Sequence, residues 1–298
     1  MRPGPDATFG HALLAGTARA ASAPAAVAGL LAFTLLFSLP SDLTPSNALF
    51  SHYLTFATWP PGLGAMPVAL WLLTNTAATA GGFRNVAADL LWLVLWSFLL
   101  GGLLDRYARN RPTRGQGFFG ACGAHFGAML RLGMIELAIN LGGFLVLLPR
   151  LSVNPYARAA VLLLLLTLGA VFHYARVRLV VEDRRSALGA VLAGGRFVRR
   201  HAAASVAIYL LFAACLLVPY LILLRLPPRE FDPGWIALVV GEAFIALQLF
   251  AACASLASAA VLFQSRLAHA SYTAGPRLEW PESPAAEAIA NLTSSTHS

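Results

Sequence analysis

The hydrophobic pattern of this chain consists of long apolar runs separated by segments that contain arginine. A helix needs about 20 mostly apolar residues to cross the hydrocarbon core of a bilayer. Six runs approach that length, and the first does so when residues 20–24 are included. The runs lack the alternation typical of barrel strands, and lipid otherwise accepts only helices as spanning elements. The pattern therefore predicts an all-α transmembrane helical bundle, with spans at about 20–40, 85–104, 129–148, 159–173, 202–224 and 235–263.

These spans divide the chain into three predicted parts: an N-terminal cytoplasmic tail at 1–19, a six-helix transmembrane domain at 20–265, and a cytoplasmic tail at 266–298. The last part mixes Ser, Thr, Pro, Glu and Ala without apolar periodicity, a composition typical of disorder. The first apolar run could instead be a cleaved signal peptide. No small-x-small cleavage site follows it, which favours a retained helix.

One further apolar segment, residues 62–82, is interrupted by Pro67 and contains several threonines. Counting it as a span would place the N-terminal arginines outside the cell. We therefore favour an interfacial or partly re-entrant helix in the first outer loop, and a spanning helix remains the alternative.

The composition supports a membrane location, because 58% of the residues are hydrophobic and 11% are charged. Soluble domains contain about 25% charged residues. The net charge of +8 comes from arginine, since the chain has no lysine. These arginines lie between apolar spans, so anionic lipid headgroups are the expected partner rather than nucleic acid.

The distribution of arginine also predicts the orientation. With both termini inside, sixteen of the 21 arginines fall on the cytoplasmic side. This N-in, C-in topology satisfies the positive-inside rule.

The inner loop at 174–201 is the most distinctive polar segment. Asp183 or Ser186 can cap a short helix, and Leu188, Val191 and Leu192 form an apolar stripe within it. Such a segment is expected to lie on the inner leaflet with its arginines toward phosphates. It is alternatively a partner-docking element, or a connector that only fixes orientation. The candidate anionic-lipid contacts are Arg176, Arg178, Arg184, Arg185, Arg196, Arg199 and Arg200.

Glu136 is the most informative polar residue at membrane depth, with Asn140 one turn away on the same helix face. A carboxylate in the hydrocarbon region costs several kcal/mol unless it is paired, protonated or hydrated. One interpretation is a structural hydrogen bond that holds Glu136 neutral. The other is a proton- or cation-coupled site formed by Glu136, Asn140 and Glu242. His173, at the inner end of a span, is expected at the interface.

Other side chains predict packing rather than chemistry. Asp105 is expected to pair with Arg109 one turn later. Ala251, Ser255 and Ala259 give the last span a small-residue face for close helix contact. The cysteines are far apart and are read as small buried hydrophobes; they are Cys122, Cys215 and Cys253.

No catalytic motif and no metal-ligand spacing occurs in the sequence, so we predict a non-enzymatic protein without cofactor or metal. The first hypothesis is a scaffold or lipid-interacting component of the membrane. The alternative is a small transporter or permease that uses Glu136, Asn140 and Glu242. Whether the chain forms a homo-oligomer or binds another membrane protein stays open.

The inner-loop sequence VVEDRRSALGAVLAGGRFVRRH resembles that of uncharacterised bacterial membrane proteins, which are similar to the membrane domain of some glycerophosphoryl diester phosphodiesterases. The resemblance covers roughly residues 85–265. It implies a multi-pass protein of the bacterial inner membrane. It carries over no catalytic residue, because the chain has no phosphodiesterase domain. The shared positions are Glu182, Ser186, Ala187, Arg196, Phe197 and Arg199.

Overall fold

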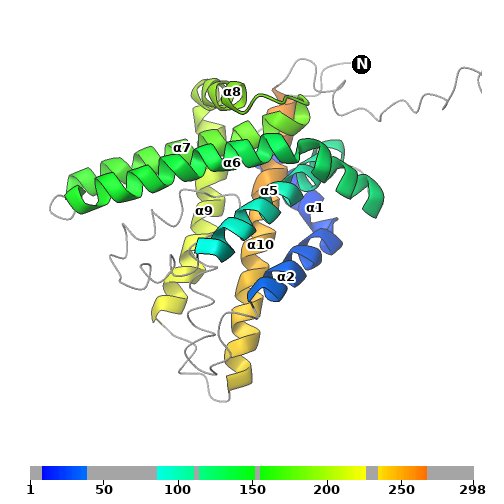
Figure 1. The fold of residues 1–298 in the computed structure, drawn as a ribbon, viewed down its shortest axis with the longest axis horizontal. Coiled ribbons are helices and arrows are strands. Elements are labelled where there is room, and N and C mark those ends of the chain that lie inside the picture. Colours follow the sequence, from blue (N-terminus) through cyan, green and yellow to red (C-terminus); the bar gives the residue numbers. More distant parts are fainter. Residues whose placement is uncertain (1–8, 39–85, 111–113, 152–154, 226–233, 267–298) are drawn as a thin grey trace, which may run out of the picture.

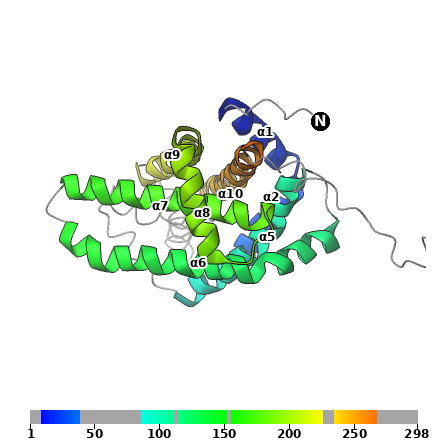
Figure 2. The same ribbon diagram turned by 90° about the horizontal axis from the view of Figure 1, so that it is seen from above.

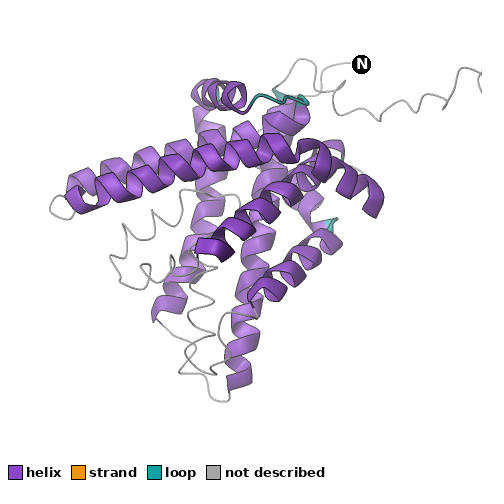
Figure 3. Cartoon of the chain, viewed as in Figure 1, coloured by secondary structure: helices purple, strands orange, loops and turns teal. Residues whose placement is uncertain are grey.

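The computed structural model describes residues 9–38, 86–110, 114–151, 155–225 and 234–266. Within these ranges every regular element is a helix, and Figure 3 also shows the described loop between α7 and α8. The helices are α1 (Phe9–Ala21), α2 (Pro24–Ser38), α5 (Val86–Arg109), α6 (Gly115–Leu151), α7 (Pro155–Val181), α8 (Ala187–Arg200), α9 (Ala202–Arg225) and α10 (Gly234–Ser265). The all-α prediction is therefore confirmed for the described part of the chain.

Two segments are long and apolar enough to cross a membrane, Gly115–Ile139 in α6 and Ile245–Ser265 in α10. Two bent helix pairs meet the same test when each pair is taken together. The α1–α2 pair bends by 65° and the α8–α9 pair by 105°. The described residues therefore contain two candidate membrane spans, or up to four if each bent pair is one span.

The helices are not all aligned. In Figure 1, α6 and α7 lie side by side and cross α9 and α10 at a steep angle. Figure 2, turned by 90°, looks nearly along α9 and α10 while α6 and α7 still extend across the view. The α6–α7 hairpin thus lies crosswise to the α9–α10 pair.

The C-terminal ends of α1, α5 and α10 meet at one end of the molecule. The guanidinium of Arg19 donates to the carbonyl of Tyr107 at 2.7 Å and to the side-chain oxygen of Gln264 at 3.3 Å. Gln264 in turn donates to the carbonyl of Ala108 at 2.8 Å. These bonds satisfy carbonyls at the last turn of α5, where the helix leaves its acceptors unpaired.

Helix α8 joins the same end. The rings of Phe197 in α8 and Phe263 in α10 lie 4.9 Å apart, and Tyr174 in α7 lies at the same distance from Phe197. We call this region the basic end. It comprises the C-terminal turns of α1, α5, α7 and α10, all of α8, and the start of α9.

A close contact between α1 and α10 closes the bundle. Ala12, Gly16 and Ala20 are buried at four-residue spacing on α1. A Cβ on Gly16 would overlap the backbone of Ser258. On α10, the predicted small face of Ala251, Ser255 and Ala259 is buried, which confirms its packing role.

Several boundaries differ from the sequence prediction. Residues 9–19, assigned to the N-terminal tail, form most of α1, because their small residues fit against α10. Helix α6 begins at Gly115 rather than near residue 129, and α7 continues to Val181 rather than ending at His173. The predictions for residues 62–82 and for most of 266–298 lie outside the described residues.

Candidate functional site

A buried ion pair links α6 to α7. Arg176 donates to one carboxylate oxygen of Glu136, and the two residues are 6% and 4% exposed. The sequence singled out Glu136 but placed Arg176 among the lipid contacts. Because α7 remains helical beyond His173, Arg176 points into the bundle with His173, which lies three residues earlier on the same face.

Three more polar side chains lie in the same region, and one of them, Tyr209, is close to both members of the pair. The Nε2 of His173 lies 3.3 Å from both the carbonyl oxygen and the hydroxyl of Ser255 in α10. The ring of Tyr209 in α9 lies 5.9 Å from that of His173. We call these five residues, from α6, α7, α9 and α10, the polar core cluster: Glu136, His173, Arg176, Tyr209 and Ser255. His173 is buried in it, and its expected position at the membrane interface stays a prediction.

Some polar atoms in this region have no hydrogen-bond partner among the described residues. They are the second carboxylate oxygen of Glu136, the hydroxyl of Tyr209 and the amide nitrogen of Gln248. Gln248 precedes Ser255 by two turns on α10, so both occupy one helix face. The cluster therefore retains spare hydrogen-bonding capacity inside the protein.

The contact between His173 and Ser255 permits two hydrogen-bond arrangements, which depend on the tautomer of His173. The Ser255 hydroxyl and the His173 imidazole resemble a nucleophile and its base. However, Nε2 lies equally close to the Ser255 carbonyl oxygen, which accepts a hydrogen bond from Nε2 when this nitrogen carries a proton. An Nε2–H bonded to that carbonyl has no lone pair with which to deprotonate the hydroxyl.

The transport hypothesis named two further residues. Asn140 lies in α6 and Glu242 in α10, but their side chains lie outside the described residues. The structure therefore does not bring Glu136, Asn140 and Glu242 together into one described site. The neighbours of Glu136 that it does show are Arg176 and Tyr209.

Helix α8 forms a second candidate site, at the basic end. Its N-cap is Ser186, one of the two predicted caps, and the Ser186 hydroxyl accepts from the amide of Gly189 at 3.2 Å. One face packs on α7, and a Cβ on Gly194 would lie 2.8 Å from the carbonyl oxygen of Val171. The buried residues of this face are Ala187, Ala190, Gly194, Phe197 and Val198.

The opposite face of α8 is open. Leu188 and Leu192 are 68% and 69% exposed, as are some leucines of other helices, such as Leu14 and Leu163. Arg196 and Arg199 continue the same stripe at i+8 and i+11 and are also exposed. Two leucines followed by two arginines thus form one exposed ridge, which we call the α8 ridge.

The seven predicted lipid contacts fall into three groups. Five are exposed at or beside α8: Arg184, Arg185, Arg196, Arg199 and Arg200. Arg178 is half-buried, where it pairs with Glu182 at 2.8 Å and donates to the carbonyl of Gly189 at 3.1 Å. Arg176 lies in the polar core cluster.

Other sequence predictions can be checked here. Asp105 and Arg109 form the expected ion pair, at 2.6 Å. Cys122 and Cys253 are buried as predicted, whereas Cys215 is exposed. No group of three or more His, Cys, Asp or Glu side chains in the described ranges is arranged to hold a metal ion.

Comparison of the chain with protein-family models, with curated proteins and with solved structures finds no match. The function must therefore be inferred from the chain's own residues.

Proposed function

We propose that this protein is a non-enzymatic, multi-pass component of a bacterial inner membrane that binds anionic lipid headgroups at its basic end. In this proposal six helices span the bilayer, with α6 and α7 strongly tilted relative to α9 and α10, and both termini are cytoplasmic. The resemblance of the inner loop to a phosphodiesterase membrane domain belongs to the same proposal. The meeting of α1, α5, α7 and α10 at one end supports it, because the segments richest in arginine then face one side.

The observation that carries the proposal is the α8 ridge. Leu188 and Leu192 are exposed, and full burial of a leucine side chain is favourable by about 1.5–3 kcal/mol of free energy. Exposure to water is therefore unfavourable for both. At a membrane surface the leucines enter the acyl boundary while Arg196 and Arg199 reach phosphates. Each arginine near an anionic surface contributes about 1 kcal/mol.

The test compares two charge-matched double variants of the purified protein. R196Q/R199Q removes two arginines from the ridge, and R114Q/R131Q removes two exposed arginines outside α8. Thermal unfolding in neutral detergent is followed with added phosphatidylglycerol or phosphatidylcholine. Wild type and R114Q/R131Q are expected to gain more stability from phosphatidylglycerol, and R196Q/R199Q is expected to lose most of that difference.

The proposal is overturned if wild type responds equally to both lipids. It is also overturned if the two double variants lose the preference to the same extent, because the ridge would then have no special role.

A transporter is the second candidate, and one observation favours it: the unpaired oxygen of Glu136 inside the protein. Arg176 weighs against it, because a carboxylate held by a buried guanidinium is already neutralised. The transporter hypothesis requires proton or cation flux in vesicles containing the protein, and this flux must disappear in Glu136→Gln.

A further inference from the structure

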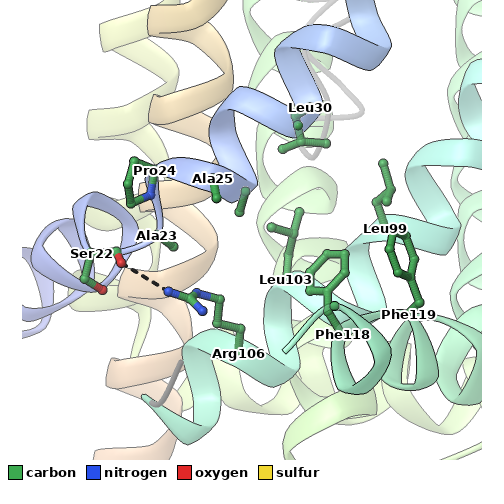
Figure 4. A pocket seen from close by; sticks show the side chains of 13 residues that line it. Ser22, Ala23, Pro24, Ala25, Leu30, Leu99, Leu103, Arg106, Phe118 and Phe119 are labelled. Atoms are coloured by element: carbon green, nitrogen blue, oxygen red, sulfur yellow. Dashed lines mark hydrogen bonds between the residues drawn. The ribbon is translucent and has the colours of Figure 1, made fainter. Parts of the chain in front are cut away.

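A pocket lies between the α1–α2 bend, the C-terminal half of α5 and the start of α6 (Figure 4). Its volume of about 460 Å³ is within the range of small-molecule sites. The side chains that matter here are Leu30, Leu99, Leu103, Arg106, Phe118 and Phe119. All except Arg106 are apolar, so most of the pocket suits hydrocarbon.

The polar group of the pocket lies at one side. In Figure 4, Arg106 lies beside Ser22, whose carbonyl accepts from the guanidinium at 3.1 Å, and Leu30 and Leu99 lie away from it. No carboxylate among the described residues forms a salt bridge with Arg106. The guanidinium therefore brings a positive charge to the pocket, and no carboxylate of the described residues neutralises it.

The polar and apolar parts of the pocket follow the direction of α5. Arg106 lies in the last turn of α5, at the basic end, and Leu103 and Leu99 follow at one-turn intervals toward the interior of α5. A bound molecule whose charged group lies at the basic end would thus place its apolar part along α5, beside Leu103 and Leu99.

We propose that this pocket holds one anionic lipid, with its phosphate or carboxylate at Arg106 and one acyl chain over Leu30, Leu99, Leu103 and Phe118. The proposal rests on the membrane location proposed above and adds a single bound lipid at a site separate from the α8 ridge. A free anion would leave the apolar walls uncovered. A zwitterionic lipid brings its phosphate together with a cationic group, so the net positive charge at the site would remain. An anionic amphiphile complements both parts.

The first test fills the pocket. A Cβ added to Gly29, which lines the pocket, has no neighbour within 4 Å, so Gly29→Leu projects its side chain into the open space. Gly123→Leu is the matched control, because Gly123 is equally open but does not line the pocket. Both changes raise helix propensity to a similar degree.

Native mass spectrometry of the purified full chain measures retention of phosphatidylglycerol, phosphatidylcholine and inorganic phosphate. Wild type and Gly123→Leu are expected to retain one phosphatidylglycerol. We expect Gly29→Leu to bind it at least tenfold more weakly, and phosphatidylcholine and phosphate to bind weakly to all three proteins.

A second variant tests the charge without filling the pocket. Arg106→Gln is expected to weaken phosphatidylglycerol binding about fivefold, and Arg106→Lys to keep most of it. Retention that is unchanged in both Gly29→Leu and Arg106→Gln overturns the proposal, as does equal retention of phosphatidylcholine.

The α8 variant R196Q/R199Q separates this inference from the proposed function. It is expected to keep the single bound lipid while losing the general preference for anionic lipid. Loss of the bound lipid in R196Q/R199Q, with retention in Gly29→Leu, would place that lipid on α8 and overturn the pocket assignment alone.

Discussion

At the scale of single residues, the Glu136–Arg176 pair makes the sharpest prediction. Glu136→Leu leaves Arg176 charged and buried without its carboxylate, and we expect the free energy of unfolding to fall by about 3–5 kcal/mol. The double variant Glu136→Leu/Arg176→Met is expected to recover most of this loss, because neither charge remains in the core. Unfolding of the purified protein in detergent measures both effects.

The control for this prediction is the Asp105–Arg109 pair, which is more exposed. Asp105→Asn is expected to cost less than about 1 kcal/mol, because this pair lies one helical turn apart and is only partly buried. If the Glu136→Leu single variant and the double variant prove equally unstable, the loss comes from the size and shape of residue 136 rather than from the unpaired charge.

The sequence revealed some of these residues because their signals are local. Glu136 is conspicuous as a carboxylate in an apolar run, and the Ser186 cap and the Asp105–Arg109 pair depend on neighbours within one turn. Arg176 was assigned to the surface because it follows an apolar run. Its partner is 40 residues away, and only the three-residue spacing from His173 suggests that it faces the core.

At the scale of helices, the α1–α10 contact depends on the absence of a side chain at Gly16. We expect Gly16→Ala to destabilise the protein by about 1–3 kcal/mol, because its Cβ would overlap the backbone of Ser258. Gly10→Ala is the matched control on the same helix, where the added Cβ has no neighbour within 4 Å. Unfolding of the two variants in detergent gives the comparison, and equal stability would contradict the close packing.

The sequence predicted helix α8 but missed α1 for a physical reason. A cap and an apolar stripe mark α8 within its own residues. Helix α1 has small buried residues at four-residue spacing. These residues stabilise the fold through close packing against α10, which the sequence of α1 alone does not reveal. A face of small residues can be recognised in a sequence when it lies within a predicted apolar span, as on α10.

At the scale of the whole molecule, the proposed topology places the two ends of α7 on opposite sides of the membrane. Tyr156 is highly exposed near the start of α7, and Ser186 is exposed just after its end. In a background where the native cysteines are replaced by serine, Tyr156→Cys is expected to react with an impermeant maleimide added outside intact cells. Ser186→Cys should react only in inverted vesicles.

Labelling of Ser186→Cys from outside would reverse the orientation, and labelling of both cysteines from one side would mean that α7 does not span. Either result would remove the basis for six spans with cytoplasmic termini.

The crossing of α6–α7 over α9–α10 could not be predicted from the sequence. These helices carry apolar residues around much of their circumference, so no single stripe specifies which neighbour each one faces. The lengths of apolar runs predict that helices form, whereas crossing angles depend on side-chain shapes brought together from distant segments.

The seating of α1 on α10 has a consequence for biogenesis. Arg19 and Gln264, which meet across this contact, are 245 positions apart in the chain. A ribosome delivers α1 long before α10 exists, so the surface around Gly16 stays uncovered by α10 until Ser258 has been synthesised. The packing of α1 against α10 is therefore a late step of folding, and a chaperone has time to shield α1 in the interval.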